Sequence, residues 1–235
     1  MRFTRAELES FRDAEVPDLL GPGTRLLFAG INPGLRTAAT QTHFGNPGNR
    51  FWPALHRAGI LPDPVDVSDP MTDEVRAALV ARGIGISNLV RRATARADEL
   101  TAAELHEGAE LLVGLVERVR PRVVAVLGIT AYRTAFGLPR AVPGRQPEPL
   151  GAAALWVVPN PSGLNAHETI DSLAAAYAEP ARADRPFRQA GRSGHPELFA
   201  ELTPLQVGSA PVFLAPNQER PVAFAQDLVG EQVGL

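Results

Sequence analysis

Three short polar loops, each close behind an apolar run, carry the side chains best suited to chemistry. The first contains Asn32, the second Asn88 and the third Asn160, and a proline follows the first and third of these. Because ligands bind at the carboxyl ends of the strands in an open parallel sheet, we expect these loops to meet at one edge. A side-chain amide both donates and accepts hydrogen bonds. An Asn-Pro step alone usually forms only a turn, but two of them after two buried runs indicate a polar binding site.

The composition excludes several kinds of catalysis. All 23 basic residues are Arg, so no lysine amine is present to form a Schiff base or to bind phosphates in a Walker A loop. The chain has no Cys, which excludes a thiol nucleophile, a disulfide, cysteine-bound zinc and an iron–sulfur cluster. The five histidines show no metal-ligand spacing, since they stand at positions 43, 56, 106, 167 and 195. We therefore expect no metal and no cofactor.

The elements that position the polar loops follow from the hydrophobic pattern. Four continuous apolar runs predict buried strands of a parallel sheet at residues 25–30, 84–90, 123–128 and 155–159. Apolar residues at helical spacing and capping signals predict helices at 5–13, 49–59, 71–82, 101–120, from 130 onward and at about 166–178. The stretch 31–48 is expected to be a loop. Strands that alternate with helices predict an α/β fold with helices on both faces of a mainly parallel sheet.

The length of the chain and the distribution of its charges indicate how it is organised. The 235 residues have a net charge of −3, but 19–62 hold four Arg and no acid, whereas 63–74 hold five acids and no base. Residues 1–179 are expected to form one catalytic domain, and 180–235 a Pro-rich C-terminal extension of unknown role. No secretory leader and no membrane span are predicted. We expect a cytoplasmic monomer.

The polar loops carry motifs that resemble a known family. Gly30-Ile31-Asn32-Pro33-Gly34-Leu35, Asn49-Arg50-Phe51-Trp52 and Asn160-Pro161-Ser162-Gly163-Leu164-Asn165 resemble mismatch-specific uracil-DNA glycosylase, in the thymine-DNA glycosylase family of the uracil-DNA glycosylase superfamily. The resemblance covers roughly residues 20–179. It implies a three-layer α/β/α sandwich with a short, mainly parallel central sheet. It also implies removal of uracil mispaired with guanine from double-stranded DNA during base-excision repair, with ethenocytosine as a further candidate base and thymine as a weak substrate.

The resemblance also implies roles for individual residues. Asn32 matches the residue that holds the attacking water, and Phe44 matches an aromatic side chain that stacks on the flipped base. Thr37 lies near the C5 edge of the base, where the thymine-processing branch has Ala, so uracil should be preferred to thymine. Other base-binding positions are Ile31, His43, Asn88 and Asn160.

The last motif corresponds to a loop that enters the duplex. Leu164 would be the wedge, Gly163 and Asn165 would read the widowed guanine, and Ser162 would contact a phosphate. The family often has Arg two residues after the wedge, where this chain has Ala166, so a second penetrating side chain and some affinity for the abasic product are in doubt. Phosphate contacts are expected from arginines of the two basic segments, namely Arg36, Arg91 and Arg92, with Arg96 beside them.

Two other kinds of function remain open at this stage. A protein that binds mismatches or abasic sites with little catalysis would use the same wedge and the same amides. A generic nucleotide-binding α/β protein would not bind duplex DNA, and the chain lacks a Gly-x-Gly-x-x-Gly turn after its first strand. The absence of Lys favours a glycosylase without lyase activity.

Overall fold

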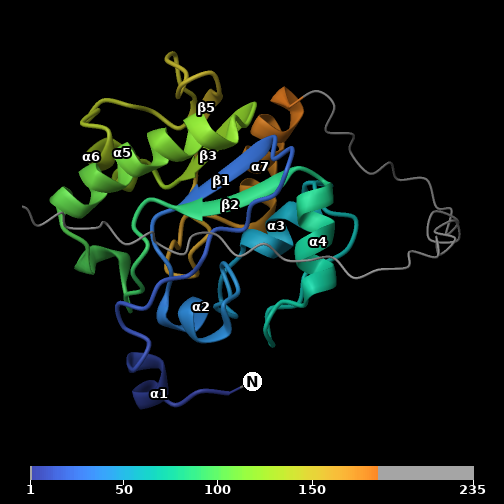
Figure 1. Cartoon of the computed structure of the whole chain (residues 1–235), viewed down its shortest axis with the longest axis vertical. Coiled ribbons are helices and arrows are strands. Elements are labelled where there is room, and N and C mark those ends of the chain that lie inside the picture. Colours follow the sequence, from blue (N-terminus) through green and yellow to red (C-terminus); the bar gives the residue numbers. More distant parts are fainter. Residues whose placement is uncertain (1, 185–235) are drawn as a thin grey trace, which may run out of the picture. The chain divides into compact units, whose positions relative to one another are not determined.

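A five-stranded sheet forms the centre of the molecule in the computed structural model, which describes residues 2–184 (Figure 1). The strand order is β2-β1-β3-β5-β4. Four strands are parallel, and the edge strand β4 runs antiparallel to β5. The strands are β1 (Leu26–Gly30), β2 (Ile84–Asn88), β3 (Val123–Leu127), β4 (Gly144–Arg145) and β5 (Ala154–Val158).

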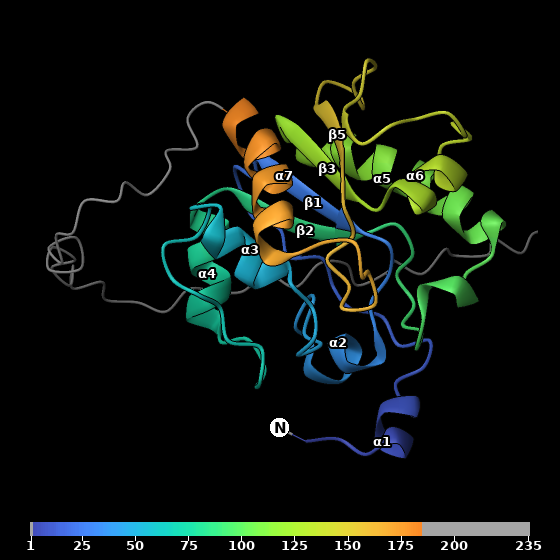
Figure 2. The same cartoon turned by 180° about the vertical axis from the view of Figure 1, so that it is seen from behind.

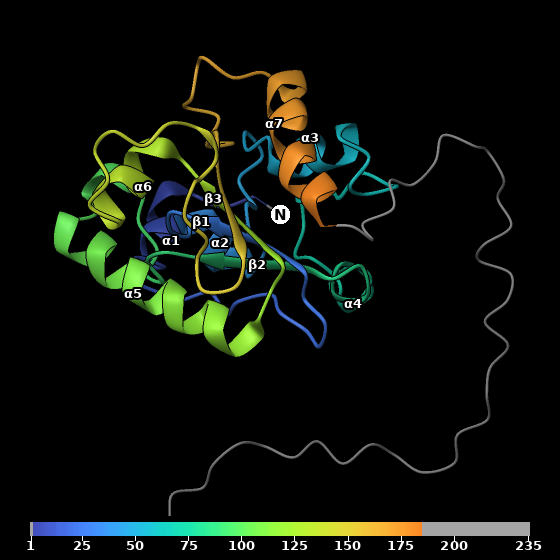
Figure 3. The same cartoon turned by 90° about the horizontal axis from the view of Figure 1, so that it is seen from above.

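The apolar runs form strands because both faces of the sheet are covered. Along β1, Leu26 and Phe28 point to one face, and Leu27 and Ala29 to the other; all four are fully buried. The first face packs on α3 (Phe51–Arg57), α4 (Asp73–Ala81) and α7 (Ile170–Ala183). The second packs on α5 (Ala102–Val119) and α6 (Ile129–Ala135). Figures 2 and 3 show these two helical layers on opposite sides of the sheet, which confirms the three-layer α/β/α architecture.

The structure corrects three expectations about local structure. The stretch 31–48 was expected to be a loop, but it contains α2 (Leu35–Thr40), a helix too short and too weakly capped to give a periodic signal. The two-residue strand β4 was not predicted. The last helix begins at Ile170, after a capping box at Thr169, and extends to Ala183. The expected domain boundary at 179 therefore falls inside α7, and the extension beyond 184 lies outside the described residues.

Two short helices complete the described chain. Near the N-terminus lies α1 (Arg5–Glu9), which ends before the predicted residue 13, and η1 (Ala97–Glu99) precedes α5. Among residues 2–184, no helix combines the length and the apolar character needed to cross a membrane.

The strand order creates one ligand-binding crevice. From β1 the chain crosses to β2 on one side, and the later strands lie on the other side, so the connections diverge between β1 and β3. In open α/β sheets, ligands bind outside the carboxyl ends of the strands at such a point. The three polar loops follow β1, β2 and β5 there, as the sequence predicts.

Helix α5 is pressed against the end of β2 at a glycine. A Cβ on Gly108 would lie 2.5 Å from the Leu89 carbonyl oxygen, whereas one on Gly114 of the same helix would meet nothing closer than 3.6 Å. Because Gly108 has no side chain, α5 can pack directly against the backbone of Leu89, the residue that follows Asn88.

We predict opposite effects for two alanine substitutions in α5. Gly108→Ala should lower the free energy of unfolding by about 1–3 kcal/mol, since the new methyl group meets backbone. Gly114→Ala, the matched control, should raise it by up to about 1 kcal/mol through helix propensity. Urea denaturation measures both changes, and equal effects of the two substitutions would contradict the tight contact.

Candidate active site

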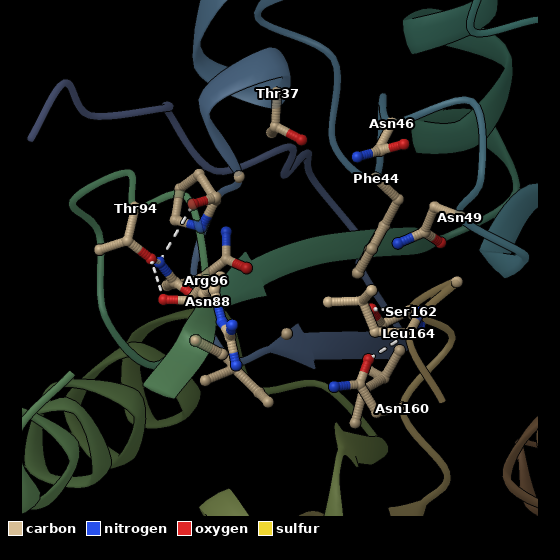
Figure 4. Close-up of a pocket in the computed structure, with 18 of the residues that line it drawn as sticks. Thr37, Phe44, Asn46, Asn49, Asn88, Thr94, Arg96, Asn160, Ser162 and Leu164 are labelled. Carbon is tan, nitrogen blue, oxygen red and sulfur yellow. Dashed lines mark hydrogen bonds between the residues drawn. The ribbon is translucent and has the colours of Figure 1, made fainter. Parts of the chain in front are cut away.

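A cleft of about 470 Å3 opens at the carboxyl ends of the parallel strands. It is lined by residues from β1, β2 and β3 and from the loops that follow β1, β2 and β5 (Figure 4). Of the expected site residues, the structure brings together in this lining Ile31, Asn32, Thr37, His43, Phe44, Asn88, Asn160, Ser162, Gly163 and Leu164. Asn165 lies just outside it. The volume is in the usual range for small-molecule sites.

The side chain of Asn32 is held in one orientation. Its Nδ2 donates to the Pro33 carbonyl at 3.1 Å, to the Arg92 carbonyl at 3.2 Å and to Thr94 Oγ1 at 2.7 Å. Two of these partners are carbonyl oxygens, which only accept, so the amide nitrogen must face them. Within residues 2–184, no protein group donates to Asn32 Oδ1. This oxygen is an available acceptor on a residue that lines the cleft.

Thr94 is a site residue that sequence reasoning missed. It is buried, accepts from Asn32 Nδ2 through Oγ1 and donates from the same atom to the Arg96 carbonyl at 2.7 Å. Its backbone N–H donates to the Pro33 carbonyl at 3.2 Å. Thr94 lies six residues after the end of β2 and in no motif, so only the fold reveals this contact.

The cleft contains no acidic side chain among the described residues that line it. No group of three or more His, Cys, Asp or Glu side chains suited to a metal ion occurs in residues 2–184. The chemistry of the cleft therefore depends on amides, hydroxyls, backbone groups, one imidazole and the guanidinium of Arg96.

That imidazole, His43, is only 2% exposed. Its Nε2 lies 3.0 Å from the Pro17 carbonyl oxygen, which only accepts, so Nε2 carries the proton and Nδ1 is an acceptor. Burial lowers the pKa of His43 below its ordinary value, and the bond to Pro17 only partly opposes this effect. The ring is neutral near pH 7.

Phe44 has one ring face available to the cleft. It stacks on Phe51 with ring centroids 4.0 Å apart and an interplanar angle of 26°. Its φ of 55° is in the left-handed region, a conformation that stores about 1–3 kcal/mol of strain. The hydrogen bond from Trp52 Nε1 to the His43 carbonyl, 2.9 Å long, helps to hold the preceding residue in place.

A glycine lets Phe44 and Asn88 approach the end of β1. A Cβ on Gly30 would lie 2.5 Å from Asn88 Oδ1 and 3.3 Å from the Phe44 ring. Asn88 is half-buried, and its side-chain amide has no hydrogen-bond partner within the part of the chain that the structure describes. An aromatic face and a free amide therefore lie at the same place. Thr37, also buried, lines the cleft near them and accepts from the Gly45 N–H.

The third polar loop presents an exposed leucine on a fixed frame. Leu164 is 83% exposed. Asn160 Oδ1 accepts from the Ser162 N–H at 3.0 Å, and Asn165 Nδ2 donates to the Asn160 carbonyl at 3.0 Å. A Cβ on Gly163 would lie 2.6 Å from the Gly48 carbonyl oxygen, so the loop packs directly against the segment before α3.

Arg50 supports this loop from beneath. Its guanidinium donates to the carbonyl oxygens of Ser162, Glu168 and Asn165, the last at 2.7 Å. Its backbone N–H donates to the Pro161 carbonyl at 3.0 Å. Arg50 therefore has a structural role.

The three arginines expected to contact phosphates make contacts within the protein, and none of them lines the cleft. Arg36 donates to the Gly45 and Ser68 carbonyls. Arg91 pairs with Asp18, and Arg92 pairs with Asp13 and Glu104; the closest N–O distances are 3.3 Å, 2.9 Å and 2.5 Å. Arg96 does line the cleft, in an exposed pair with Asp98. The role of these arginines toward DNA stays a prediction.

The chain is similar to known proteins in sequence and in structure. The sequence profile of the Uracil DNA glycosylase superfamily matches residues 17–181, a range that contains all three polar loops. Among solved structures, the chain is similar to a solution NMR structure of a Methanosarcina acetivorans protein named as a candidate uracil DNA glycosylase. The sequence identity is 21% and the TM-score 0.48; the match covers 71% of this chain and 96% of the other.

The buried His43 predicts a defined pH dependence of stability. With a lowered folded-state pKa, the imidazole binds a proton more readily when the protein is unfolded, where its pKa is about 6.5. Its contribution to stability is complete above that pH and is lost as the pH falls toward the folded-state pKa. His43→Gln keeps a donor for the Pro17 carbonyl without a titrating group. Urea denaturation from pH 8 to pH 5 should therefore show a smaller loss of stability for His43→Gln than for wild type, and parallel losses would contradict this assignment.

Proposed function

Since the chain belongs to the Uracil DNA glycosylase superfamily, a family of DNA glycosylases, we propose that it removes uracil mispaired with guanine from double-stranded DNA. The reaction is hydrolysis of the N-glycosidic bond, with a free base and an abasic site as products. The observation that carries the proposal is the fixed side-chain amide of Asn32, a residue that lines the cleft. Among residues 2–184, no group donates to its Oδ1 and no carboxylate lines the cleft.

Asn32 Oδ1 accepts a hydrogen bond from a water molecule and orients its lone pair toward C1′ of the nucleotide. An amide is too weak a base to deprotonate water fully. This suits a mechanism in which the glycosidic bond breaks early and positive charge develops on the sugar, so a weak nucleophile is sufficient. Positioning then supplies much of the rate acceleration. A slow chemical step follows from the same argument.

The base is bound outside the helical stack. The uracil ring lies on the free face of Phe44, whose other face is covered by Phe51. The Asn88 amide, free of protein partners among the described residues, donates and accepts at the polar edge of the base. Together these groups favour a flipped pyrimidine over a stacked one.

The exposed Leu164 fills the space that the flipped nucleotide leaves. Its loop is held by Arg50 and by close packing against Gly48, so the side chain can enter the duplex without first being ordered. Unstacking a nucleotide requires a few kcal/mol and least at a mismatch, which favours G·U sites. The absence of lysine agrees with hydrolysis without lyase chemistry.

Single-turnover release of uracil from a G·U duplex, with wild type beside Asn32→Ala, tests the proposal. Wild type should release uracil, and Asn32→Ala should bind the same duplex with similar affinity while its rate falls at least about a hundredfold. Binding without release by either protein would instead indicate a mismatch-binding protein. Equal rates for the two proteins would show that Asn32 is not the catalytic residue.

Thr37 is predicted to select uracil over thymine. It is a buried, β-branched residue of the cleft, and the resemblance places it near C5 of the base. Thr37→Ala should raise the ratio of G·T to G·U cleavage about tenfold, because it removes two heavy atoms, Oγ1 and Cγ2, and relief of crowding by one group of this size is worth about 1–3 kcal/mol. Thr40→Ala is the matched control, since Thr40 is buried in the same helix but outside the cleft lining. An unchanged ratio in Thr37→Ala would contradict this role.

A further inference from the structure

Two of the three oxygens that hold Asn32 belong to one short segment. The Arg92 carbonyl and Thr94 Oγ1 accept from Asn32 Nδ2, and Ala93 lies between them, fully buried. The position of residues 92–94 therefore determines the position of the Asn32 amide. Whatever fixes this segment acts directly on the proposed catalytic group.

The N-terminal segment, residues 5–15, supports residues 92–94 from the side opposite Asn32. Glu15 and Arg92 form an antiparallel bridge. The Asp13 N–H donates to the Ala93 carbonyl at 2.9 Å, and the Ala93 N–H donates to the Ala14 carbonyl at 2.9 Å. The two chain segments are thus joined by backbone hydrogen bonds in both directions.

Side chains reinforce this junction. The Arg92 guanidinium pairs with Asp13 at 2.9 Å and with Glu104 at 2.5 Å, so it joins the N-terminal segment to the start of α5. The hydrogen bond from Arg92 lowers the pKa of Glu104 to about 2, so the pair remains charged at every physiological pH. Arg12 pairs with Glu99 in η1, which provides a second link between the same regions.

A small apolar cluster fills the space between these elements. Val16 and Ala93 pack with Ala38 of α2, and Phe11 and Ala14 cover them. The cluster is separate from the two main cores and lies beside the loop that carries Asn32. Residues 5–15 themselves precede the range matched by the superfamily profile, which begins at residue 17.

We propose that the N-terminal segment and Arg92 form a support that positions Asn32, and that Arg92 is a positioning residue instead of a phosphate contact. The proposal rests on the proposed function through the catalytic role of Asn32. It follows from the chain of contacts that leads from Asp13 through the Arg92 guanidinium and backbone to the Asn32 amide. The N-terminal part of this support, residues 5–15, precedes the range that the superfamily profile matches, whereas Arg92 lies within it.

Arg92→Gln and Asp13→Asn test the proposal, with Arg182→Gln as the matched control. Arg182 also pairs with a carboxylate, Glu179, but lies at the far end of α7 and contacts none of the groups that hold Asn32. Rates are measured in single turnover at saturating enzyme on a G·U duplex. Affinity and its salt dependence are measured with a 2′-fluoro-deoxyuridine duplex, in which the fluorine opposes cleavage.

A positioning role predicts a loss of rate without a loss of binding. Arg92→Gln should lower the rate at saturation at least about tenfold, Asp13→Asn should lower it less, and Arg182→Gln should not change it. The affinity and the slope of log K against log salt should stay as in wild type. A weaker affinity with a slope reduced by about one, at an unchanged rate, would make Arg92 a phosphate contact and overturn the proposal. An Arg92→Gln protein indistinguishable from the control would also overturn it.

A second readout does not depend on glycosylase activity. In 15N-labelled protein, the Asn32 side-chain amide signals are those that disappear in Asn32→Ala. Their protons should exchange with water faster in Arg92→Gln than in wild type or Arg182→Gln, because the segment that carries two of the acceptors is then held less firmly. Unchanged exchange would overturn the positioning role. Failure of wild type to release uracil would overturn the proposed function alone. The exchange rates of the Asn32 amide protons would still show whether Arg92 positions this side chain.

Discussion

The orientation of one amide group is the constraint on which the account of this site depends. Asn32 Nδ2 faces two carbonyl oxygens and the Thr94 hydroxyl, so its Oδ1 must face away from them. A carboxylate at this position would meet the same oxygens with repulsion, which explains why the site uses an amide despite its weak basicity. An amide activates the attacking water only weakly. Such a site can therefore catalyse only a reaction in which the leaving group departs with little help from the nucleophile.

The sheet fixes where the loops of the site meet, and packing within the loops fixes how their side chains are oriented. The buried strands bring the carboxyl ends of β1, β2 and β5 to one edge, and the absence of a side chain at Gly30 lets Phe44 and Asn88 meet there. The strained backbone of Phe44 is kept by the aromatic cluster beneath it. Apolar packing thus provides the energy that holds polar groups in an orientation they would not adopt in a free loop.

Sequence reasoning succeeded where a segment carries its own signal. The continuous apolar runs predicted four of the five strands, and the capping box at Thr101 predicted the start of α5. Asn32 was assigned through a motif, and Phe44 and Asn88 through the family resemblance; all three line one cleft. Contacts between distant segments could not be predicted. Thr94 lies 62 residues from Asn32 in sequence and Asp13 lies 79 residues from Arg92, and no local pattern marks either pairing. For the same reason, the ion pairs of Arg92 with Asp13 and Glu104 could not be predicted.

The pH dependence of uracil release tests most directly whether a neutral amide, without a general base, positions the water. Single-turnover rates at saturating enzyme should be constant between about pH 7 and pH 9 and should show no midpoint near the ordinary pKa of histidine, because burial lowers the pKa of the only imidazole of the described cleft below that value. A rate that falls below a midpoint near the ordinary pKa of histidine, and that becomes pH-independent in His43→Gln, would contradict this account. It would make His43 the base and reduce Asn32 to a supporting residue.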